Sequence, residues 1–156
     1  MYEKFGQFID GKWSPSSNKE TYEVINPATE EVLGHASKAS PADVERALKS
    51  AEKGLKVWKK TTPWDRSYIL RKIADRMREK KDVLAKWMTL ENGKPLAEGI
   101  GETNGAADIF EWNAEETKRI FGQTIESRFE DTRVHVYYQP VGVVAALSPW
   151  NFPLIL

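Results

Sequence analysis

Apolar side chains recur at helical spacing in three successive stretches between residues 40 and 92. The first stretch opens with Ser40, Pro41 and Asp43, which are typical of the cap and first turn of a helix. Thr62-Pro63 repeats this start signal, and Gly93 is typical of a helix end. The side chains expected in the core are Val44, Ala47, Leu48, Ala51, Leu55 and Trp58 in the first helix, Ile69, Leu70, Ile73, Ala74 and Met77 in the second, and Val83, Leu84, Trp87 and Met88 in the third, over about residues 82–92.

Residues 99–105, Gly-Ile-Gly-Glu-Thr-Asn-Gly, resemble a dinucleotide-binding glycine loop. Such a loop needs a strand before it and a helix opening after it. Here the preceding residues are typical of a helix start, and position 104 is Asn rather than Gly. We therefore expect one long helix over about residues 95–121, whose glycines allow close helix packing. Its inner face would be Ile100, Thr103, Ala107, Phe110, Ala114 and Thr117.

Extended segments lie on both sides of the helices. Asp10-Gly11 between apolar residues predicts a hairpin over residues 7–13. Residues 21–25 and 31–36 are predicted to be extended, with a turn between them. Residues 132–139 alternate between two faces, which favours a projecting arm. An exposed arm strand is normally covered by another chain, because its edge is free to pair.

Residues 141–147 are an almost uninterrupted apolar run that ends at Ser148 and Pro149. A strand buried on both faces has this pattern, because helices cover both sides of a parallel sheet. A buried helix could give the same run, but its short length, its valines and the proline favour a strand. Ligands of open α/β sheets bind beyond the carboxyl ends of the strands, so the residues that follow form the candidate site.

Asn151 lies in this candidate site between Pro149 and Pro153, which restrict the backbone on either side. Its amide offers two uncharged N–H donors. A donor held rigidly beyond a strand end can stabilise an oxyanion by roughly 3 kcal/mol. Alternatively, Asn151 bonds the local backbone in a turn, and the pattern alone favours this simpler interpretation.

Charge and composition exclude several classes of function. The 23 basic and 23 acidic residues give a net charge of zero, which argues against a nucleic-acid or membrane-surface role. The basic cluster within residues 71–81 is interleaved with acidic residues, so we expect a solvated, salt-paired helix face. The absence of cysteine excludes a disulfide framework, a thiolate metal site and a thiol nucleophile within these residues, and we expect no side-chain metal centre. No apolar run approaches membrane-spanning length, and residues 1–5 lack a signal-peptide pattern. We therefore expect a cytoplasmic protein.

Five motifs follow one another along the chain: Asn26-Pro27-Ala28-Thr29; Arg66 with Ile69-Leu70-Arg71-Lys72; Glu91-Asn92-Gly93-Lys94-Pro95; Trp112-Asn113-Ala114-Glu115-Glu116 with Arg119 and Gly122; and Gln139-Pro140-Val141-Gly142-Val143-Val144 before Pro149-Trp150-Asn151-Phe152-Pro153. In this order they resemble the aldehyde dehydrogenase superfamily, over nearly the whole chain. The resemblance is closest to the succinate-semialdehyde branch.

The resemblance implies an α/β fold in three parts. Residues 1–122 would be the amino-terminal part of a Rossmann-like cofactor-binding domain, with short strands and then helices. Residues 123–140 would be the β-arm of the oligomerisation region, so that a homo-oligomer, a dimer or tetramer, forms through residues 132–139. Residues 141–156 would be the first buried parallel strand of the cofactor domain, followed by its catalytic and cofactor-binding loop.

The resemblance also implies an activity, which is the oxidation of an aldehyde or semialdehyde to a carboxylic acid with NAD or NADP by the complete enzyme. Asn151 would be the oxyanion-hole donor. The wall of the cofactor cleft would be Leu147, Ser148, Pro149, Trp150 and Asn151. A monovalent cation of the family could bind the backbone of Val24 or Ile25 and the region of Glu91.

In the family, the cysteine nucleophile, a glutamate base and a lysine on the cofactor ribose all follow the Trp-Asn motif, near which this chain stops. We therefore expect the 156 residues alone to be inactive. The alternative function is that of a non-catalytic fragment that acts only by association, through the arm or through its apolar end.

Overall fold

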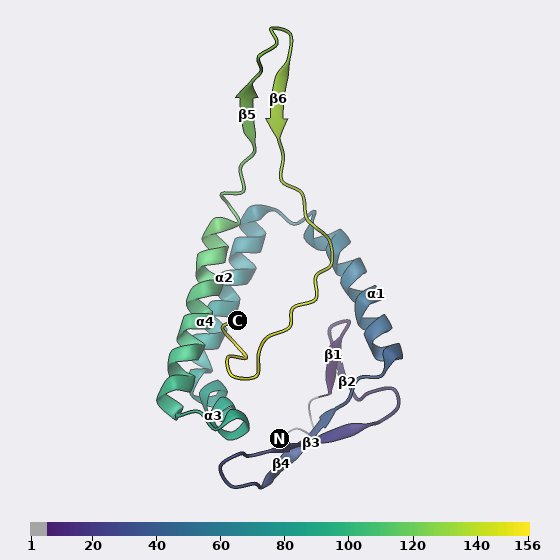
Figure 1. The fold of residues 1–156 in the computed structure, drawn as a ribbon, viewed down its shortest axis with the longest axis vertical. Helices are drawn as coiled ribbons and strands as arrows, with labels where there is room; N and C mark the ends of the chain where they lie inside the picture. The colour runs from purple at the N-terminus through teal and green to yellow at the C-terminus, as the bar shows by residue number, and fades with distance from the viewer. Residues whose placement is uncertain (1–5) are drawn as a thin grey trace.

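Four helices and three two-stranded antiparallel hairpins make up the part of the chain that a computed structural model describes, residues 6–156 (Figure 1). Residues 1–5, on which the signal-peptide prediction rests, lie outside the described residues. The helices are α1 (Pro41–Trp58), α2 (Pro63–Glu79), α3 (Lys81–Asn92) and α4 (Leu96–Glu116). The strands are β1 (Gln7–Ile9), β2 (Lys12–Ser14), β3 (Thr21–Ile25), β4 (Val32–Ser37), β5 (Gln123–Glu126) and β6 (Arg133–Val136). None of these described helices is both long and apolar enough to cross a membrane.

The predicted starts of α1 and α2 and the predicted end of α3 are confirmed. Ser40 and Asp43 form a capping box, in which each side chain accepts a hydrogen bond from the other residue's backbone N–H. Thr62 caps α2 through the N–H of Asp65, at 3.1 Å. Gly93 ends α3 with φ at +80°, a conformation that glycine adopts without steric cost. Helix α4 ends at Glu116, earlier than predicted.

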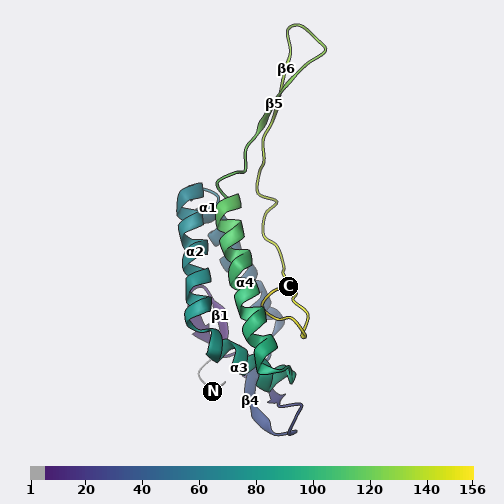
Figure 2. The ribbon, with the colours of Figure 1, turned by 90° about the vertical axis from the view of Figure 1, so that its left-hand side faces the viewer.

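The core lies where α4 packs against α2 and α3. Figures 1 and 2 both show α2 and α4 running side by side. Residues 99–105 are helical, so the rejection of a cofactor loop there is confirmed. Gly99 permits the close packing predicted, because a Cβ at this position would lie 3.0 Å from the carbonyl oxygen of Ala85 in α3. The fully or nearly buried apolar side chains are small, apart from one methionine: Ala74, Ala85, Met88, Ala106, Ala107 and Ala114.

The prediction that the stripe of α1 lies in a core is wrong for this chain. Val44 is 51% exposed, and Leu48 and Trp58 are exposed as well. The stripe faces an open groove that Val143 and Val144 line on the other side. Several stripe residues of α2 and α3, among them Ile69, Ile73 and Val83, are also exposed. Helical spacing identifies the apolar face correctly, but burial requires a neighbouring element to cover that face.

The strand predicted over residues 141–147 does not form, and neither end of the segment is buried. Val141 is 94% exposed and Leu147 is 95% exposed. A strand is defined by its hydrogen bonds to a neighbouring strand, and none of the described strands pairs with this segment. The segment instead runs as extended chain between α1 and the helices α2 and α4 (Figure 1).

The hairpins agree with the extended segments predicted. Asp10 and Gly11 form the turn between β1 and β2 with φ of 57° and 75°, as a two-residue hairpin loop requires. Strands β3 and β4 pair with a bulge between Val24 and Ile25. Strand β6 pairs with β5, which the sequence did not indicate, and the two project from the helices as an arm (Figures 1 and 2).

The salt-paired face predicted for the basic cluster is confirmed in part: Arg76 pairs with Glu79 within α2, whereas Arg71 and Arg78 pair with another helix. Arg78 donates hydrogen bonds to Asp108 and Glu111 of α4, both at 2.7 Å. Arg71 pairs with Glu115 of the same helix. These ion pairs are partly solvent-exposed, so each contributes about 0–1 kcal/mol to stability. Their effect is to favour one register between α2 and α4.

Candidate active site

Residues 147–156 form a largely exposed loop beside α4, with turns and a bend over residues 150–155 (Figures 1 and 2). Within the loop, the N–H of Phe152 donates to the carbonyl oxygen of Pro149, at 3.3 Å. The backbone amides and carbonyls of Leu147 and Ser148 have no hydrogen-bond partner among the described residues. These backbone groups are therefore available to a polar ligand.

Two buried side chains of opposite charge lie beneath this loop. Lys94 belongs to the short link between α3 and α4, and Glu102 belongs to α4. Their side chains are only 7% and 2% exposed, and they form an ion pair. Lys94 Nζ also donates to the carbonyl oxygen of Asn151, at 2.8 Å. Glu102 Oε1 accepts the N–H of Leu154, at 2.9 Å.

Local sequence explains how Lys94 comes to lie inward. Gly93 turns the chain in the left-handed region, and Pro95 precedes the first turn of α4. The lysine between them is thus held in a link too short to move independently of the two helices. Its Nζ lies 4.7 Å from the centre of the Phe152 ring, within the range of a cation–π contact.

Two further contacts attach the loop to the helices. Asn92 Nδ2 donates to the carbonyl oxygen of Trp150, at 3.1 Å. A Cβ at Gly105 would lie 2.8 Å from Cδ1 of Ile155, so Ile155 packs where only a glycine leaves room without rearrangement. The loop is therefore held by three backbone hydrogen bonds, at Trp150, Asn151 and Leu154, and by packing of the Ile155 side chain.

The side chain of Asn151 is not used for this attachment. The residue is exposed, and among residues 6–156 its amide makes no hydrogen bond. The simpler interpretation, in which the Asn151 side chain bonds the local backbone in a turn, does not describe this structure. The backbone of Asn151 is therefore held by hydrogen bonding, while its side-chain amide is free to donate to a ligand.

Comparison with known proteins identifies the family of the chain that carries this loop. A model of the aldehyde dehydrogenase family matches residues 13–156. The chain belongs to the aldehyde dehydrogenase family. The resemblance predicted from the motifs is confirmed, and so is the α/β fold class.

Among curated relatives of this aldehyde dehydrogenase chain, the glutarate-semialdehyde dehydrogenase of Pseudomonas aeruginosa is 46% identical over 94% of the chain and 30% of its own length. The NADP(+) succinate-semialdehyde dehydrogenase of Escherichia coli is 45% identical over 93% of the chain and 30% of its own length. A point mutant of betaine aldehyde dehydrogenase from Staphylococcus aureus, solved in complex with NAD+, superposes with a TM-score of 0.92 at 34% identity, over 97% of this chain and 31% of that one. The chain thus spans about 30% of the length of the relatives it matches.

The predicted site residues of this family member, Leu147 to Asn151, are consecutive in the sequence, and the structure leaves all of them exposed. Their roles at the cofactor and the oxyanion stay predictions. The cation site at the backbone of Val24 or Ile25 and the region of Glu91 also stays a prediction. The turn after β3 does lie against the end of α3, where a Cβ at Gly93 would be 3.0 Å from Cγ of Pro27.

Sequence reasoning missed Lys94 and Glu102, although both lie in segments that it singled out. A signal for Glu102 was available, because it shares a helical face with Gly99, Thr103 and Ala106, which are all buried. A carboxylate on an apolar face predicts a buried cationic partner, since an isolated buried charge is very costly. The sequence offered no means of choosing Lys94 as that partner.

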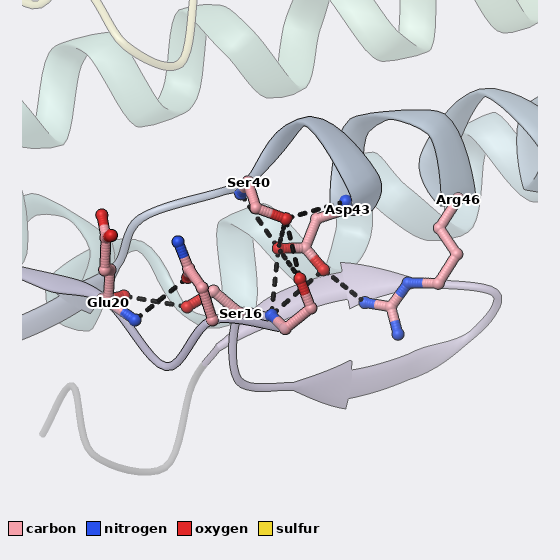
Figure 3. A network of polar contacts seen from close by, with 7 residues as sticks. Ser16, Glu20, Ser40, Asp43 and Arg46 are labelled. Carbon is pink, nitrogen blue, oxygen red and sulfur yellow. Dashed lines mark hydrogen bonds and ion pairs between the residues drawn. The ribbon is translucent and has the colours of Figure 1, made fainter.

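Asp43 is the other buried acid of the described chain with a defined network, and it is structural (Figure 3). Its carboxylate accepts the backbone N–H of Ser40 and of Ser17, at 3.0 and 3.1 Å. These two backbone bonds, with the hydroxyls of the same serines, hold the pKa of Asp43 well below its ordinary value. The network ties the turn before β3 to the start of α1, away from the loop.

Proposed function

We propose that this protein oxidises an aldehyde to a carboxylic acid with NAD or NADP. The observation that carries the proposal is the free amide of Asn151 on a loop held by three backbone hydrogen bonds and by the side chain of Ile155. Preorganised donors stabilise developing charge without having to reorganise during the reaction. Membership of the aldehyde dehydrogenase family supports the reaction class.

In this proposal the amide of Asn151 donates a hydrogen bond to the aldehyde oxygen as it becomes an oxyanion. A donor in this role contributes roughly 3 kcal/mol to the transition state. The anion forms when a nucleophile adds to the carbonyl carbon, and the family resemblance implies a cysteine thiolate for that step. The 156 residues contain no cysteine, so the thiolate would come from outside them, and these residues alone would not turn over.

The residues from Leu147 to Trp150 fit one wall of a cofactor site. The unbonded backbone groups of Leu147 and Ser148 can bond ribose hydroxyls, and the exposed Trp150 ring adds an apolar surface. The hydride that leaves the carbonyl carbon would pass to bound NAD or NADP, and water would hydrolyse the resulting thioester to release the carboxylic acid and the thiol. The relatives include an NADP(+) enzyme and an NAD+ complex, so the proposal covers both cofactors.

The substrate class that we propose is a semialdehyde of a short dicarboxylic acid, as in the names of the relatives. The test is aldehyde-dependent reduction of NAD+ and of NADP+ by the full-length enzyme that carries these residues. Succinate and glutarate semialdehydes are compared with butanal, which lacks the carboxylate. Reduction with a semialdehyde at a higher kcat/KM than with butanal supports the proposal, and no reduction with any aldehyde contradicts it.

A second proposal concerns assembly, and the β5–β6 arm favours it. Ile125, Val134, Tyr137 and Tyr138 are all exposed on or beside the arm. Exposed apolar strands with free edges are normally covered by another chain, and we propose a second copy of this protein. Light scattering after size-exclusion chromatography tests this: we expect an oligomer that Val134→Lys weakens and that Val57→Lys, at an exposed valine of α1 outside the arm, does not. A monomer at high concentration would contradict it.

A further inference from the structure

We propose that Lys94 and Glu102 act as positioning residues for the oxidation, by holding the backbone that follows the Asn151 side chain, from the Asn151 carbonyl to the Leu154 N–H. The inference rests on the proposed oxyanion role of Asn151. Neither side chain is exposed enough to contact a substrate, since both are almost fully buried beneath the loop. Their action on the reaction would pass through the backbone of residues 151–154.

Lys94 and Glu102 bond different backbone groups of the loop, one as a donor and the other as an acceptor. Lys94 has only donors, and its Nζ bonds one carboxylate oxygen and the carbonyl oxygen of Asn151. Glu102 has only acceptors, and its second oxygen bonds the N–H of Leu154. The carbonyl at the start of the turn and the amide at its end are thus bound to opposite charges of one ion pair.

Charge-assisted bonds of this kind are shorter and stronger than neutral ones, so they restrict the turn more tightly. The loop offers few other attachments, because Pro149 and Pro153 have no N–H. A buried ion pair is also a poor source of stability compared with apolar packing of the same volume. We therefore infer that the main effect of this pair is to fix the geometry of the loop rather than to stabilise the fold.

A purely structural pair would need only two opposite charges at these two positions. Exchanging them in the double variant Lys94→Glu with Glu102→Lys keeps the net charge and the ion pair. In this variant the new glutamate at position 94 lies opposite the Asn151 carbonyl, and both groups are acceptors. The new lysine at position 102 lies opposite the Leu154 N–H, and both groups are donors. Both bonds to the loop are therefore lost. The exchange therefore separates a structural role from a positioning role.

The kinetic test uses the full-length enzyme. We expect Lys94→Met to lower kcat by about 10- to 100-fold, because a small displacement of a group that contacts the reacting atoms costs that much. The KM for the cofactor should change by no more than about twofold. Lys86→Met is the matched control, since Lys86 is an exposed lysine of α3. The charge exchange should leave kcat as low as Lys94→Met does. Recovery of kcat by the exchange would overturn the positioning role.

A double-variant cycle shows whether Lys94 acts through Asn151. If it does, Lys94→Met should cause little further loss in an enzyme that already carries Asn151→Ala. Independent, multiplying losses would overturn the inference. A second measurement, which does not depend on turnover, tests directly whether the pair holds the loop.

Hydrogen–deuterium exchange of peptides spanning residues 150–156 provides that measurement. We expect Glu102→Ala to speed exchange in this segment and Glu102→Gln, which keeps an acceptor for Leu154, to speed it less. Unchanged exchange in Glu102→Ala would overturn the hold of the pair on the loop. If instead exchange responds as expected while Asn151→Ala leaves turnover unchanged, the oxyanion role fails and the pair is structural only.

Discussion

Gly99 of α4 packs against Ala85 of α3 so closely that a Cβ at Gly99 would lie 3.0 Å from the Ala85 carbonyl oxygen and 3.2 Å from its Cα. Glu102 lies three residues further along the same face of α4, and Lys94 lies in the link that joins the two helices. The distance between α3 and α4 therefore determines whether Lys94 and Glu102 can meet beneath the loop. A contact between two small residues sets the geometry of the candidate site.

Alanine at Gly99 should destabilise the protein although it lies inside a helix. A helical Gly→Ala substitution on an open surface stabilises by roughly 0.5–1 kcal/mol, because glycine loses more backbone entropy on folding. At Gly99 the added methyl meets backbone of α3, and overpacking of this kind costs about 1–3 kcal/mol. Urea unfolding of each variant measures the difference.

Gly101→Ala is the matched control for this prediction, since a Cβ at Gly101 meets nothing within 4 Å. We expect Gly101→Ala to stabilise and Gly99→Ala to destabilise. Equal effects of the two substitutions on the free energy of unfolding would show that the α3–α4 contact is not tight.

Gly93→Ala should cost about 1–2 kcal/mol of folding free energy. The residue has φ of +80°, which an L side chain adopts at that cost, and its Cβ would approach Pro27. The same substitution at Gly54, inside α1 with nothing within 4 Å, should stabilise instead. Thermal unfolding of both variants checks the prediction, and a Gly93→Ala variant as stable as the parent would contradict it.

The stability of the protein should fall in acid partly through Asp43. Its folded-state pKa lies below the ordinary value of 3.8, because backbone N–H groups of Ser40 and Ser17 bond the carboxylate. The group therefore contributes stability that is present above about pH 4 and is lost as pH falls toward the folded-state pKa. Asp43→Asn should lower stability near neutral pH and reduce the loss of stability between about pH 5 and pH 3.

Ser40→Ala is the control for Asp43, because it removes a hydroxyl but keeps the backbone N–H that bonds the carboxylate. It should cost roughly 0.5–2 kcal/mol as a lost helix cap at every pH. Because the hydroxyl supplies only part of the bonding to the carboxylate, the dependence on pH should weaken less than in Asp43→Asn. Urea unfolding at several pH values measures both effects, and an unaltered pH dependence in Asp43→Asn would contradict the role of Asp43.

Features that depend on a few neighbouring residues could be predicted from the sequence. Ser40 and Gly93 mark helix ends through their own side chain or backbone, and the helical identity of residues 99–105 followed from what precedes them. The exposed loop around Asn151 was found for the same reason, because its prolines and its apolar approach are local.

Features that depend on distant residues could not be predicted. Whether Val44 or residues 141–147 are buried depends on which elements cover them, and their own pattern cannot state that. The bond from Lys94 to Asn151 joins residues 57 apart in the sequence. A motif containing each of them was recognised, but nothing in either motif showed that the two meet.

The rate of the chemical step in an Asn151→Ala variant of the full-length enzyme, measured with saturating cofactor, is the most direct test of the proposed function. We expect this rate to fall by roughly 100- to 1,000-fold while cofactor affinity changes little, because the amide acts on the oxyanion. Asn113→Ala, an exposed asparagine of α4, should keep the parent rate. An Asn151→Ala enzyme as fast as the parent would contradict the oxyanion role.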